Sequence, residues 1–244
     1  MTTKKRMQLN LCTLVCFAIL CIYSCNSNTV SDFDGNKYTT ITIGNQTWLR
    51  ENLKTTKFND GSPIATGFND KEWAELKTSA YCIYPYSMID GYNSSQEVLE
   101  SYGALYNWHA VETEKLCPLG WKVPSNDDWS ELFKYLGNKP ITKLKANFGW
   151  DENGNGTDEY GFSALPSGYR FGGNGSFGGI KTISSWWSST ESDEEGAWTR
   201  NLDSSGVEEK IGGMMQIFGQ SPEIGNSNSY KSGGSSVRCL KVIN

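Results

Sequence analysis

Residues 117–137 read CPLGWKVPSNDDWSELFKYLG and carry more mutually consistent local signals than any other segment of the chain. Ser125 followed three residues later by Asp128 resembles a capping box, and Pro124 discourages helix before it. Gly137 can adopt the left-handed conformation that closes a helix. The apolar residues between them recur at i, i+3, i+4 and i+7 and so form one face. They are Trp129, Leu132, Phe133 and Leu136. The pattern predicts a helix over about residues 125–137.

A second helix is expected directly afterwards, over about residues 140–148. Pro140 suits the first turn of a helix, and Ile141, Leu144 and Phe148 would share one side of it. Most other segments favour short strands. Gly44-Asn45 joins 40–43 and 46–49 as a hairpin, and further strands are expected at 81–84, 183–190, 197–202 and 236–242. With 26 glycines and 9 tryptophans, the composition favours turns and aromatic packing. We expect an α+β fold of irregular antiparallel sheets with two main helices.

Two strands raise more specific expectations. Trp186 and Trp187 are neighbours in a predicted strand, so their side chains must point to opposite faces of a sheet. We therefore expect one of them to face the surface. Residues 197–202 are expected to pair with 207–211 across the turn at 203–206.

The first 25 residues have the layout of a bacterial export signal. Lys4-Lys5-Arg6 form a basic start, and residues 9–23 are predominantly apolar but too short to span a bilayer comfortably. Ser24-Cys25 resembles the end of a lipoprotein signal, so we expect Cys25 to carry the lipid that holds the protein to a membrane. The chain then divides into a signal over 1–25, a polar tether over 26–37 and one domain over 38–244. An ordinary secretory signal or a retained anchor is the alternative.

The charge balance bears on the partners. Loss of the signal removes three positive charges and no negative charge, so the formal net charge falls from −5 to −8. A protein that neutralises phosphates carries a basic face, which argues against nucleic acid as a partner. The acidic runs at 193–195 and 208–209 offer paired carboxylates for acid–base chemistry, but such runs usually form solvated faces.

Three cysteines belong to the expected domain: Cys82, Cys117 and Cys239. In an oxidising compartment, one disulfide and one free thiol is the simplest outcome. We favour Cys117 with Cys239, which would join the central segment to the last strand and leave Cys82 as a buried thiol. Pairing of Cys82 with Cys117 remains the alternative. The chain contains no CxxC spacing, so we do not expect these three cysteines to bind zinc.

The segment 151–159 contains the opening pattern of a calcium loop, but its twelfth position is Phe162 instead of glutamate, so an EF-hand is rejected. Two interpretations of this segment remain: a solvated acidic loop, or a looser calcium site. The ligands of the calcium site would be Asp151, Asn153, Asn155 and Asp158. Apart from this calcium ion, no cofactor is expected. The only histidine, His109, is expected to be partly buried and bonded to backbone, and one histidine excludes a site built on two.

Six blocks of sequence occur in an order typical of one bacterial family. They are Trp48-Leu49-x-x-Asn52-Leu53, Tyr102-Gly103-Ala104-Leu105-Tyr106-Asn107-Trp108, Cys117-Pro118-x-Gly120-Trp121-x-Val123-Pro124-Ser125 with Trp129, Gly161-Phe162-Ser163-Ala164-Leu165-Pro166-x-Gly168-Tyr169-Arg170, Trp187-Ser188-Ser189-Thr190 and Ser236-Val237-Arg238-Cys239. Together they resemble the Fibrobacter succinogenes major paralogous domain over about residues 38–243. The resemblance implies an exported, often lipid-anchored surface protein with a fold similar to C-type lectins and sulfatase-modifying factor domains. It implies no well-defined reaction.

The lectin comparison stops short of a calcium-bound sugar site, because the Glu-Pro-Asn, Gln-Pro-Asp and Trp-Asn-Asp segments are absent. Our leading hypothesis is a non-catalytic binding or adhesion module, lipid-anchored at the outer membrane or cell surface of a Gram-negative bacterium. Its partner would be a glycan or a cell-envelope protein. The candidate contact residues are Trp186, Trp198, Tyr169 and Arg170. The alternatives are an enzyme that processes glycans or peptides with carboxylates in a cleft, and a scaffold subunit of a surface assembly.

Overall fold

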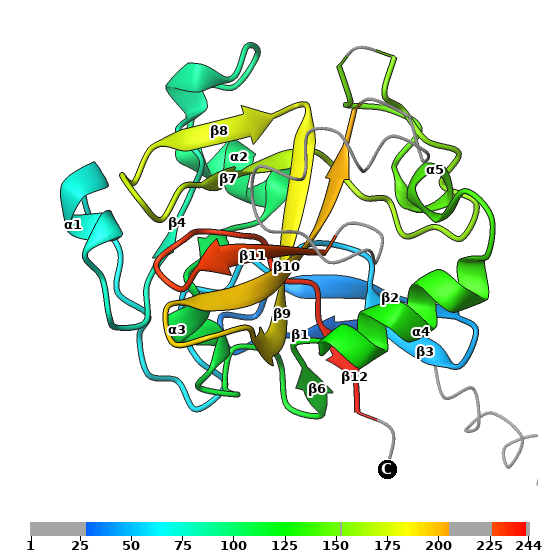
Figure 1. The fold of residues 1–244 in the computed structure, drawn as a ribbon, viewed down its shortest axis with the longest axis horizontal. Coiled ribbons are helices and arrows are strands. Elements are labelled where there is room, and N and C mark those ends of the chain that lie inside the picture. Colours follow the sequence, from blue (N-terminus) through cyan, green and yellow to red (C-terminus); the bar gives the residue numbers. More distant parts are fainter. Residues whose placement is uncertain (1–27, 152, 205–225, 243–244) are drawn as a thin grey trace, which may run out of the picture.

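The computed structural model describes residues 28–151, 153–204 and 226–242. Two five-stranded sheets and one short two-stranded sheet form the frame, and short helices pack against them (Figure 1). The strand pairs are antiparallel except for β7 with β9, so the expected mixture of helix and mainly antiparallel sheet is confirmed. No helix among the described residues has the length and apolar character needed to cross a bilayer.

The first sheet has the order β1-β2-β3-β12-β6. Its strands are β1 (Thr29–Ser31), β2 (Lys37–Ile43), β3 (Gln46–Leu49), β12 (Leu240–Lys241) and β6 (Trp121–Lys122). The predicted hairpin is confirmed: β2 and β3 pair across Gly44, whose φ of 59° suits a tight two-residue turn. Leu240 lies between Trp48 and Lys122, so the end of the chain pairs with both its beginning and its middle.

Part of the interval expected to be a polar tether is a β-strand. Residues 29–31 lie in the interval that we assigned to a polar tether, but they pair with β2 as strand β1. Val30 is half-buried and packs against the core, which explains why this segment joins the sheet. The expected signal over residues 1–25, with Cys25, lies outside the described residues.

The second sheet has the order β11-β10-β9-β7-β8. Its strands are β7 (Ser167–Arg170), β8 (Phe177–Ile180), β9 (Ile183–Glu191), β10 (Gly196–Asp203) and β11 (Asn226–Tyr230). Both Trp186 and Trp187 are buried, so the prediction that one faces the surface was wrong. The sheet has a core on each face, and the tryptophans belong to different core clusters. The strand expected at 207–211 lies outside the described residues, and β10 pairs with β9 and β11.

Helix α4 (Asn126–Leu136) forms as predicted. Ser125 accepts a hydrogen bond from the backbone of Asp128, whose carboxylate accepts one from the backbone of Ser125, which completes the capping box. Trp129, Leu132 and Leu136 are buried, while Phe133 is only half-buried. The Trp129 ring lies 4.8 Å from that of Trp48 in β3, so this helix packs on the first sheet.

The second predicted helix is shorter than expected. Helix α5 spans Pro140–Leu144, and Lys145 then bridges to Ala164 as extended chain. Phe148, which we placed on the packed side of a longer helix, is 59% exposed. Helix α2 (Ser95–Tyr102) is longer than α5, so the expectation that α5 is one of two main helices was wrong. The remaining elements are α1 (Asp70–Ala74), α3 (Trp108–Val111), the 3-10 turn Tyr86–Met88 and strands β4 (Tyr81–Cys82) and β5 (Leu105–Tyr106).

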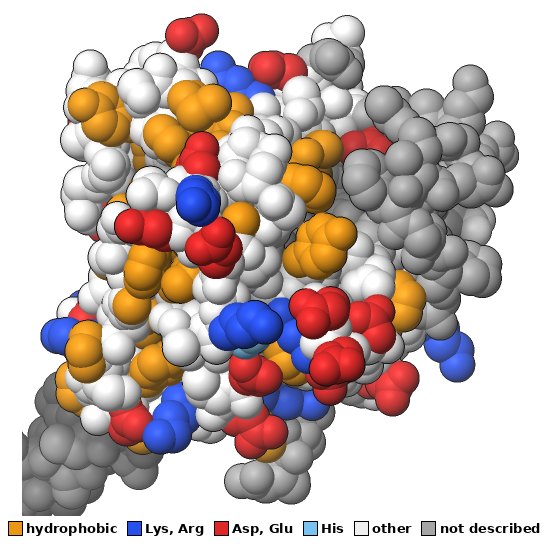
Figure 2. Space-filling model, turned by 60° about the vertical axis from the view of Figure 1, so that its left-hand side comes forward, with side chains coloured by type: hydrophobic (Ala, Val, Ile, Leu, Met, Phe, Trp, Pro, Cys, Tyr) orange, Lys and Arg blue, Asp and Glu red, His pale blue; other side chains and the backbone are white. Residues whose placement is uncertain are grey.

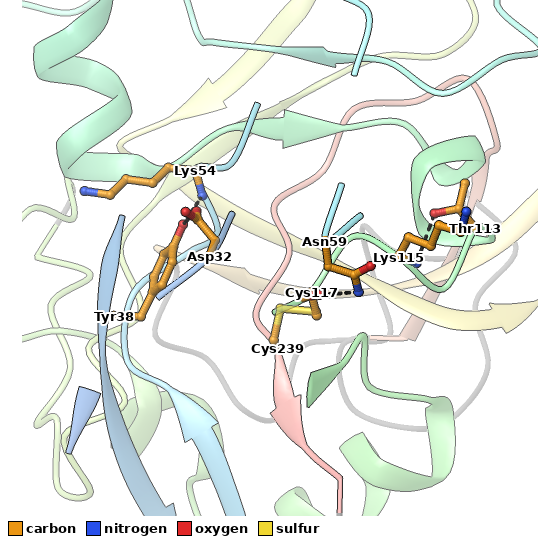
Figure 3. The surroundings of a disulfide bond; sticks show 8 residues. All are labelled: Asp32, Tyr38, Lys54, Asn59, Thr113, Lys115, Cys117 and Cys239. Atoms are coloured by element: carbon orange, nitrogen blue, oxygen red, sulfur yellow. Dashed lines mark hydrogen bonds between the residues drawn. A yellow bond between two sulfur atoms is a disulfide. The ribbon is translucent and has the colours of Figure 1, made fainter. Parts of the chain in front are cut away.

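A disulfide joins Cys117 to Cys239, which confirms the favoured pairing across 122 residues of sequence. The side chain of Asn59 donates a hydrogen bond of 3.0 Å to the carbonyl of Cys117, so a third segment is tied to the same place (Figure 3). Cys82 is a buried free thiol, so the alternative pairing with Cys117 was wrong. Burial raises the pKa of the Cys82 thiol to about 12, which makes it a poor nucleophile near neutral pH.

Replacement of both Cys117 and Cys239 by alanine is expected to lower the free energy of unfolding by ~4–5 kcal/mol, because a long closed loop is released in the unfolded chain. Chemical denaturation measures this loss. A reducing agent should lower the stability of the wild type by a similar amount and leave the double variant unchanged. Equal unfolding midpoints for the oxidised wild type and the double variant would contradict the prediction.

Candidate functional site

A pocket of about 190 Å³ lies where segments from distant parts of the sequence meet. The segment after β3 supplies Arg50, Glu51 and Asn52, and the segment that leads into β12 supplies Arg238. The other lining residues are Ser101 of α2 and Phe148, Ser163 and Leu165 from the loops between α5 and β7. The pocket therefore depends on the pairing of β3 with β12.

Arg238 forms the floor of this pocket and is 2% exposed. The Asn52 side-chain oxygen accepts from its Nε at 3.2 Å and from its Nη2 at 2.7 Å, and the Phe162 carbonyl accepts from its Nη1. The guanidinium carbon lies 4.3 Å from the centroid of the Phe162 ring and 5.5 Å from that of Trp186. Aromatic faces and one amide oxygen thus hold the cation in place.

This buried cation has no ionic partner, since Arg238 forms no ion pair with any residue that the structure describes. Its three hydrogen bonds leave two of the five guanidinium N–H groups without a described acceptor. Burial lowers the pKa of Arg238 to about 9, because a desolvated cation is disfavoured, although Glu51 and Asp158 oppose the shift. Arg238 is therefore charged at neutral pH, and its two remaining N–H groups can donate to a further acceptor.

Asn52 orients the floor of the pocket through both ends of its amide. Its oxygen also accepts from the Trp186 indole at 2.9 Å, and its nitrogen donates to the Tyr102 carbonyl at 2.9 Å. The segment is further held because Gly103 packs against it: a Cβ at Gly103 would lie 2.7 Å from the Asn52 side chain. Asn52 thus links α2, β9 and the approach to β12.

Arg50 forms the exposed rim. Its Nε and Nη2 donate to the Ser163 hydroxyl at 3.1 and 2.9 Å. Asp158 accepts from the Ser163 backbone and hydroxyl, both at 2.6 Å, and lies 3.9 Å from Arg50. Ser163 and Asp158 have φ values of 51° and 50°, in the left-handed region that costs energy for residues other than glycine. The carboxylate holds this strained turn so that the serine faces the arginine.

Phe148 supplies the apolar side of the rim. Its neighbour Trp150 is buried and donates its indole N–H to the Ala164 carbonyl at 2.9 Å, which anchors the loop. Gly149, with a φ of 86°, turns the chain between them. The loop is therefore fixed on the protein while the Phe148 ring stays in solvent.

Glu51 is the only carboxylate among the described lining residues. One of its oxygens accepts from the Thr39 backbone at 2.7 Å, so this carboxylate is tied to β2. A pair of carboxylates about 5–9.5 Å apart is the usual requirement for glycoside hydrolysis. The pocket as described offers donors and one carboxylate, which suits binding better than acid–base chemistry.

The structure does not gather the four predicted contact residues on one exposed surface. Trp186 is buried below the pocket, beneath Arg238. Arg170 is also buried: its guanidinium lies 4.4 Å from the Trp73 ring and 3.0 Å from the Asp70 carboxylate. Tyr169 and Trp198 are half-buried on β7 and β10, strands that β9 separates.

Two of the four predicted calcium ligands make other contacts. Asp158 binds Ser163 as described, and the Asn155 side-chain oxygen accepts from the Trp150 backbone at 3.1 Å. Asp151 and Asn153 are exposed in the same loop. The described residues contain no group of three or more histidine, cysteine, aspartate or glutamate side chains placed to hold a metal. The calcium site stays a prediction.

His109 binds a side chain where we expected a backbone partner. Its Nδ1 lies 2.8 Å from the carboxylate of Glu112, the residue directly after α3. The expected backbone partner was therefore wrong, although the side chain is largely buried, with 16% of it exposed.

The acidic run at 193–195 lies in an exposed turn between β9 and β10. Asp193 accepts from the Asn228 side chain at 2.9 Å and from the Glu195 backbone at 3.0 Å. The Asn228 amide lowers the pKa of Asp193, whereas a general acid needs a raised pKa. On the face drawn in Figure 2, acidic side chains gather beside lysine and arginine side chains, as in a solvated surface. Residues 208–209 lie outside the described residues.

Sequence reasoning missed the pocket residues as a group. Asn52 and Arg238 stand in the first and last of the six sequence blocks, but their positions lie 186 residues apart. Their presence in these blocks indicated that both residues matter to the family. Only the pairing of β3 with β12 shows that their side chains meet. Nothing in the sequence marked Arg50 or Phe148 as a binding residue. A single exposed arginine or phenylalanine is ordinary, and Phe148 was assigned to the packed side of a helix.

The comparisons with known proteins give one match. The model of the family described as Fibrobacter succinogenes major domain matches residues 41–241, a span that includes every residue lining the pocket. No curated protein and no solved structure matches the chain.

Replacement of Asn52 by alanine is expected to lower the free energy of unfolding by ~3–5 kcal/mol, because it leaves the buried Arg238 charge without its amide acceptor. Asn93→Ala is the control: Asn93 is exposed, its side chain makes no hydrogen bond with described residues, and the change should stay within about 0.5 kcal/mol. Urea denaturation of both variants measures the difference. A loss below about 1 kcal/mol for Asn52→Ala would refute the role given to this side chain.

Proposed function

Because the chain belongs to the Fibrobacter succinogenes major domain family, we propose that it is an exported surface module that binds a glycan or a cell-envelope protein, without catalysing a reaction. The observation that carries the proposal is the buried guanidinium of Arg238 at the floor of an open pocket, which forms no ion pair with a described residue. Keeping such a charge desolvated costs stability, and a ligand that supplies an acceptor offsets that cost. A ligand-binding role therefore explains why a charged guanidinium is kept at the floor of the pocket.

The proposal includes export and lipid anchoring at the outer membrane or cell surface of a Gram-negative bacterium. The basic start, the short apolar segment and Ser24-Cys25 support it at the level of sequence. The disulfide between Cys117 and Cys239 agrees with an oxidising compartment. The first strand that the structure describes, β1, begins at Thr29, a few residues after Cys25, so a lipid on Cys25 would hold the domain close to the membrane.

We further propose that the fold is similar to that of C-type lectins. Pairing of β3 with β12 brings the two ends of the domain together, as that fold requires. Two curled sheets with short helices packed against them also support the likeness (Figure 1). Such a likeness carries no activity by itself, because function depends on the site and not on the fold.

Cys25→Ala is expected to move the protein from the membrane fraction to the soluble fraction of a Gram-negative host that expresses the full chain, because the acylated residue is lost. Cys21→Ala is the control, since Cys21 lies within the signal and should leave anchoring unchanged. Fractionation and mass spectrometry of the processed N-terminus give the result. Unchanged membrane retention of the Cys25→Ala protein would exclude this anchor.

A glycan array and a pull-down against cell-envelope proteins test the binding role. The folded wild-type protein should retain at least one glycan class or one envelope protein. The same protein, reduced and denatured, should lose that binding, because the pocket requires segments that only the fold brings together. Blank results from both experiments with folded protein would remove the proposed function.

A further inference from the structure

We propose that the pocket formed by Arg50, Ser163, Phe148 and Arg238 binds the carboxylate of an acidic sugar. This inference rests on the binding function proposed above and adds the chemical class of the ligand. It follows from the supply of hydrogen-bond donors, the position of the buried charge and the apolar wall of the pocket.

The pocket is rich in donors. Arg238 keeps two N–H groups without a described acceptor, and Arg50 uses only its Nε and one Nη2 hydrogen on Ser163. Ser101 adds an exposed hydroxyl. Glu51 is the only described lining residue with a carboxylate, and one of its oxygens is already engaged. A ligand that fits must therefore mainly accept hydrogen bonds, and a carboxylate accepts from arginine in a planar, bidentate manner.

The two arginines differ in what they offer. Arg238 is fixed by Asn52 and by the aromatic rings beneath it, so little side-chain entropy is lost when a ligand binds it. Arg50 is exposed and adds charge from the rim. A fixed donor at the floor and a second donor at the rim favour an anion held between them.

Two carboxylates oppose an anion at this place. Glu51 lines the pocket, and Asp158 lies 3.9 Å from Arg50. Both have other tasks: Glu51 binds the Thr39 backbone, and Asp158 binds Ser163 twice. Asp158 pairs with the rim arginine, whereas Arg238 has no ion pair with a described residue, so the uncompensated charge lies at the floor. The carboxylate of the ligand is accordingly assigned to Arg238 at the floor, with Arg50 at the rim as its second donor.

The wall and the size favour a sugar over a peptide. Phe148 presents an exposed aromatic ring on the rim, and the flat C–H face of a pyranose packs well against such a ring. The volume of about 190 Å³ is below the ~300–1,000 Å³ of sites for drug-sized ligands. One sugar unit fits this size, and longer glycans would continue into solvent. A uronic acid joins the ring and the carboxylate in one unit.

The test is a titration of the folded protein followed by NMR shifts, with sodium D-glucuronate, D-glucose, sodium acetate and N-acetyl-trialanine as separate probes. D-Glucuronate is expected to bind at least about tenfold more tightly than glucose or acetate. Arg50→Gln should weaken glucuronate binding by about tenfold or more, because a charge-assisted contact is lost. Lys241→Gln is the matched control: it removes one exposed positive charge outside the pocket and should have no effect.

A second pair of variants tests the wall. Phe148→Ala should weaken glucuronate but not acetate, whereas Leu119→Ala, at a residue that is 80% exposed, should change neither. Equal binding of glucose and glucuronate, tighter binding of the tripeptide, binding unchanged by Arg50→Gln, or no binding of any probe would each overturn the inference. If the glycan array retains the same glycans with wild type and Arg50→Gln, the pocket assignment fails while the surface-binding function stands. If the glycan array and the pull-down are both blank, the pocket assignment and the surface-binding function are both refuted.

Discussion

The amide of Asn52 is the contact on which both the core and the pocket depend. It accepts from the Trp186 indole and the Arg238 guanidinium and donates to the Tyr102 carbonyl, so one side chain joins the second sheet, the segment that leads into β12 and helix α2. These partners come from distant parts of the chain, and each is buried. Because a buried polar group without a partner is costly, the network holds these elements in one arrangement.

The disulfide and the Asn52 network act on the same segment. Arg238 directly precedes Cys239, so the covalent link to Cys117 fixes the backbone that carries the guanidinium. Phe162 then packs beneath Arg238, and its carbonyl accepts from it, which brings in the loop with the strained Ser163. The floor of the pocket is thus part of the core, while its rim consists of loops. This division is common in binding sites, where a rigid frame positions variable loops.

The parts of the fold that were predicted correctly are those set by local chemistry. Ser125, Asp128 and Gly137 mark the ends of α4, and Gly44-Asn45 marks a hairpin. The predicted length of the second helix was wrong because Lys145 pairs with Ala164 as extended chain. The helical spacing of apolar residues does not reveal such a competing strand pairing. The prediction that either Trp186 or Trp187 faces the surface failed because a sheet with a core on each face buries both neighbours, and one sequence does not reveal how many layers cover a sheet. The pocket was missed for the same reason, since its residues meet only through long-range pairing.

The central claim is that Asn52 holds a charged Arg238 in the protein interior. NMR of protein labelled with ¹⁵N in the arginine side chains tests it, through the rate at which the Arg238 Nε–H exchanges with water. We expect a resolved, slowly exchanging signal at neutral pH, because this N–H donates to Asn52 at 3.2 Å and is shielded by aromatic rings. Exchange as fast as that of a fully solvated arginine would contradict it.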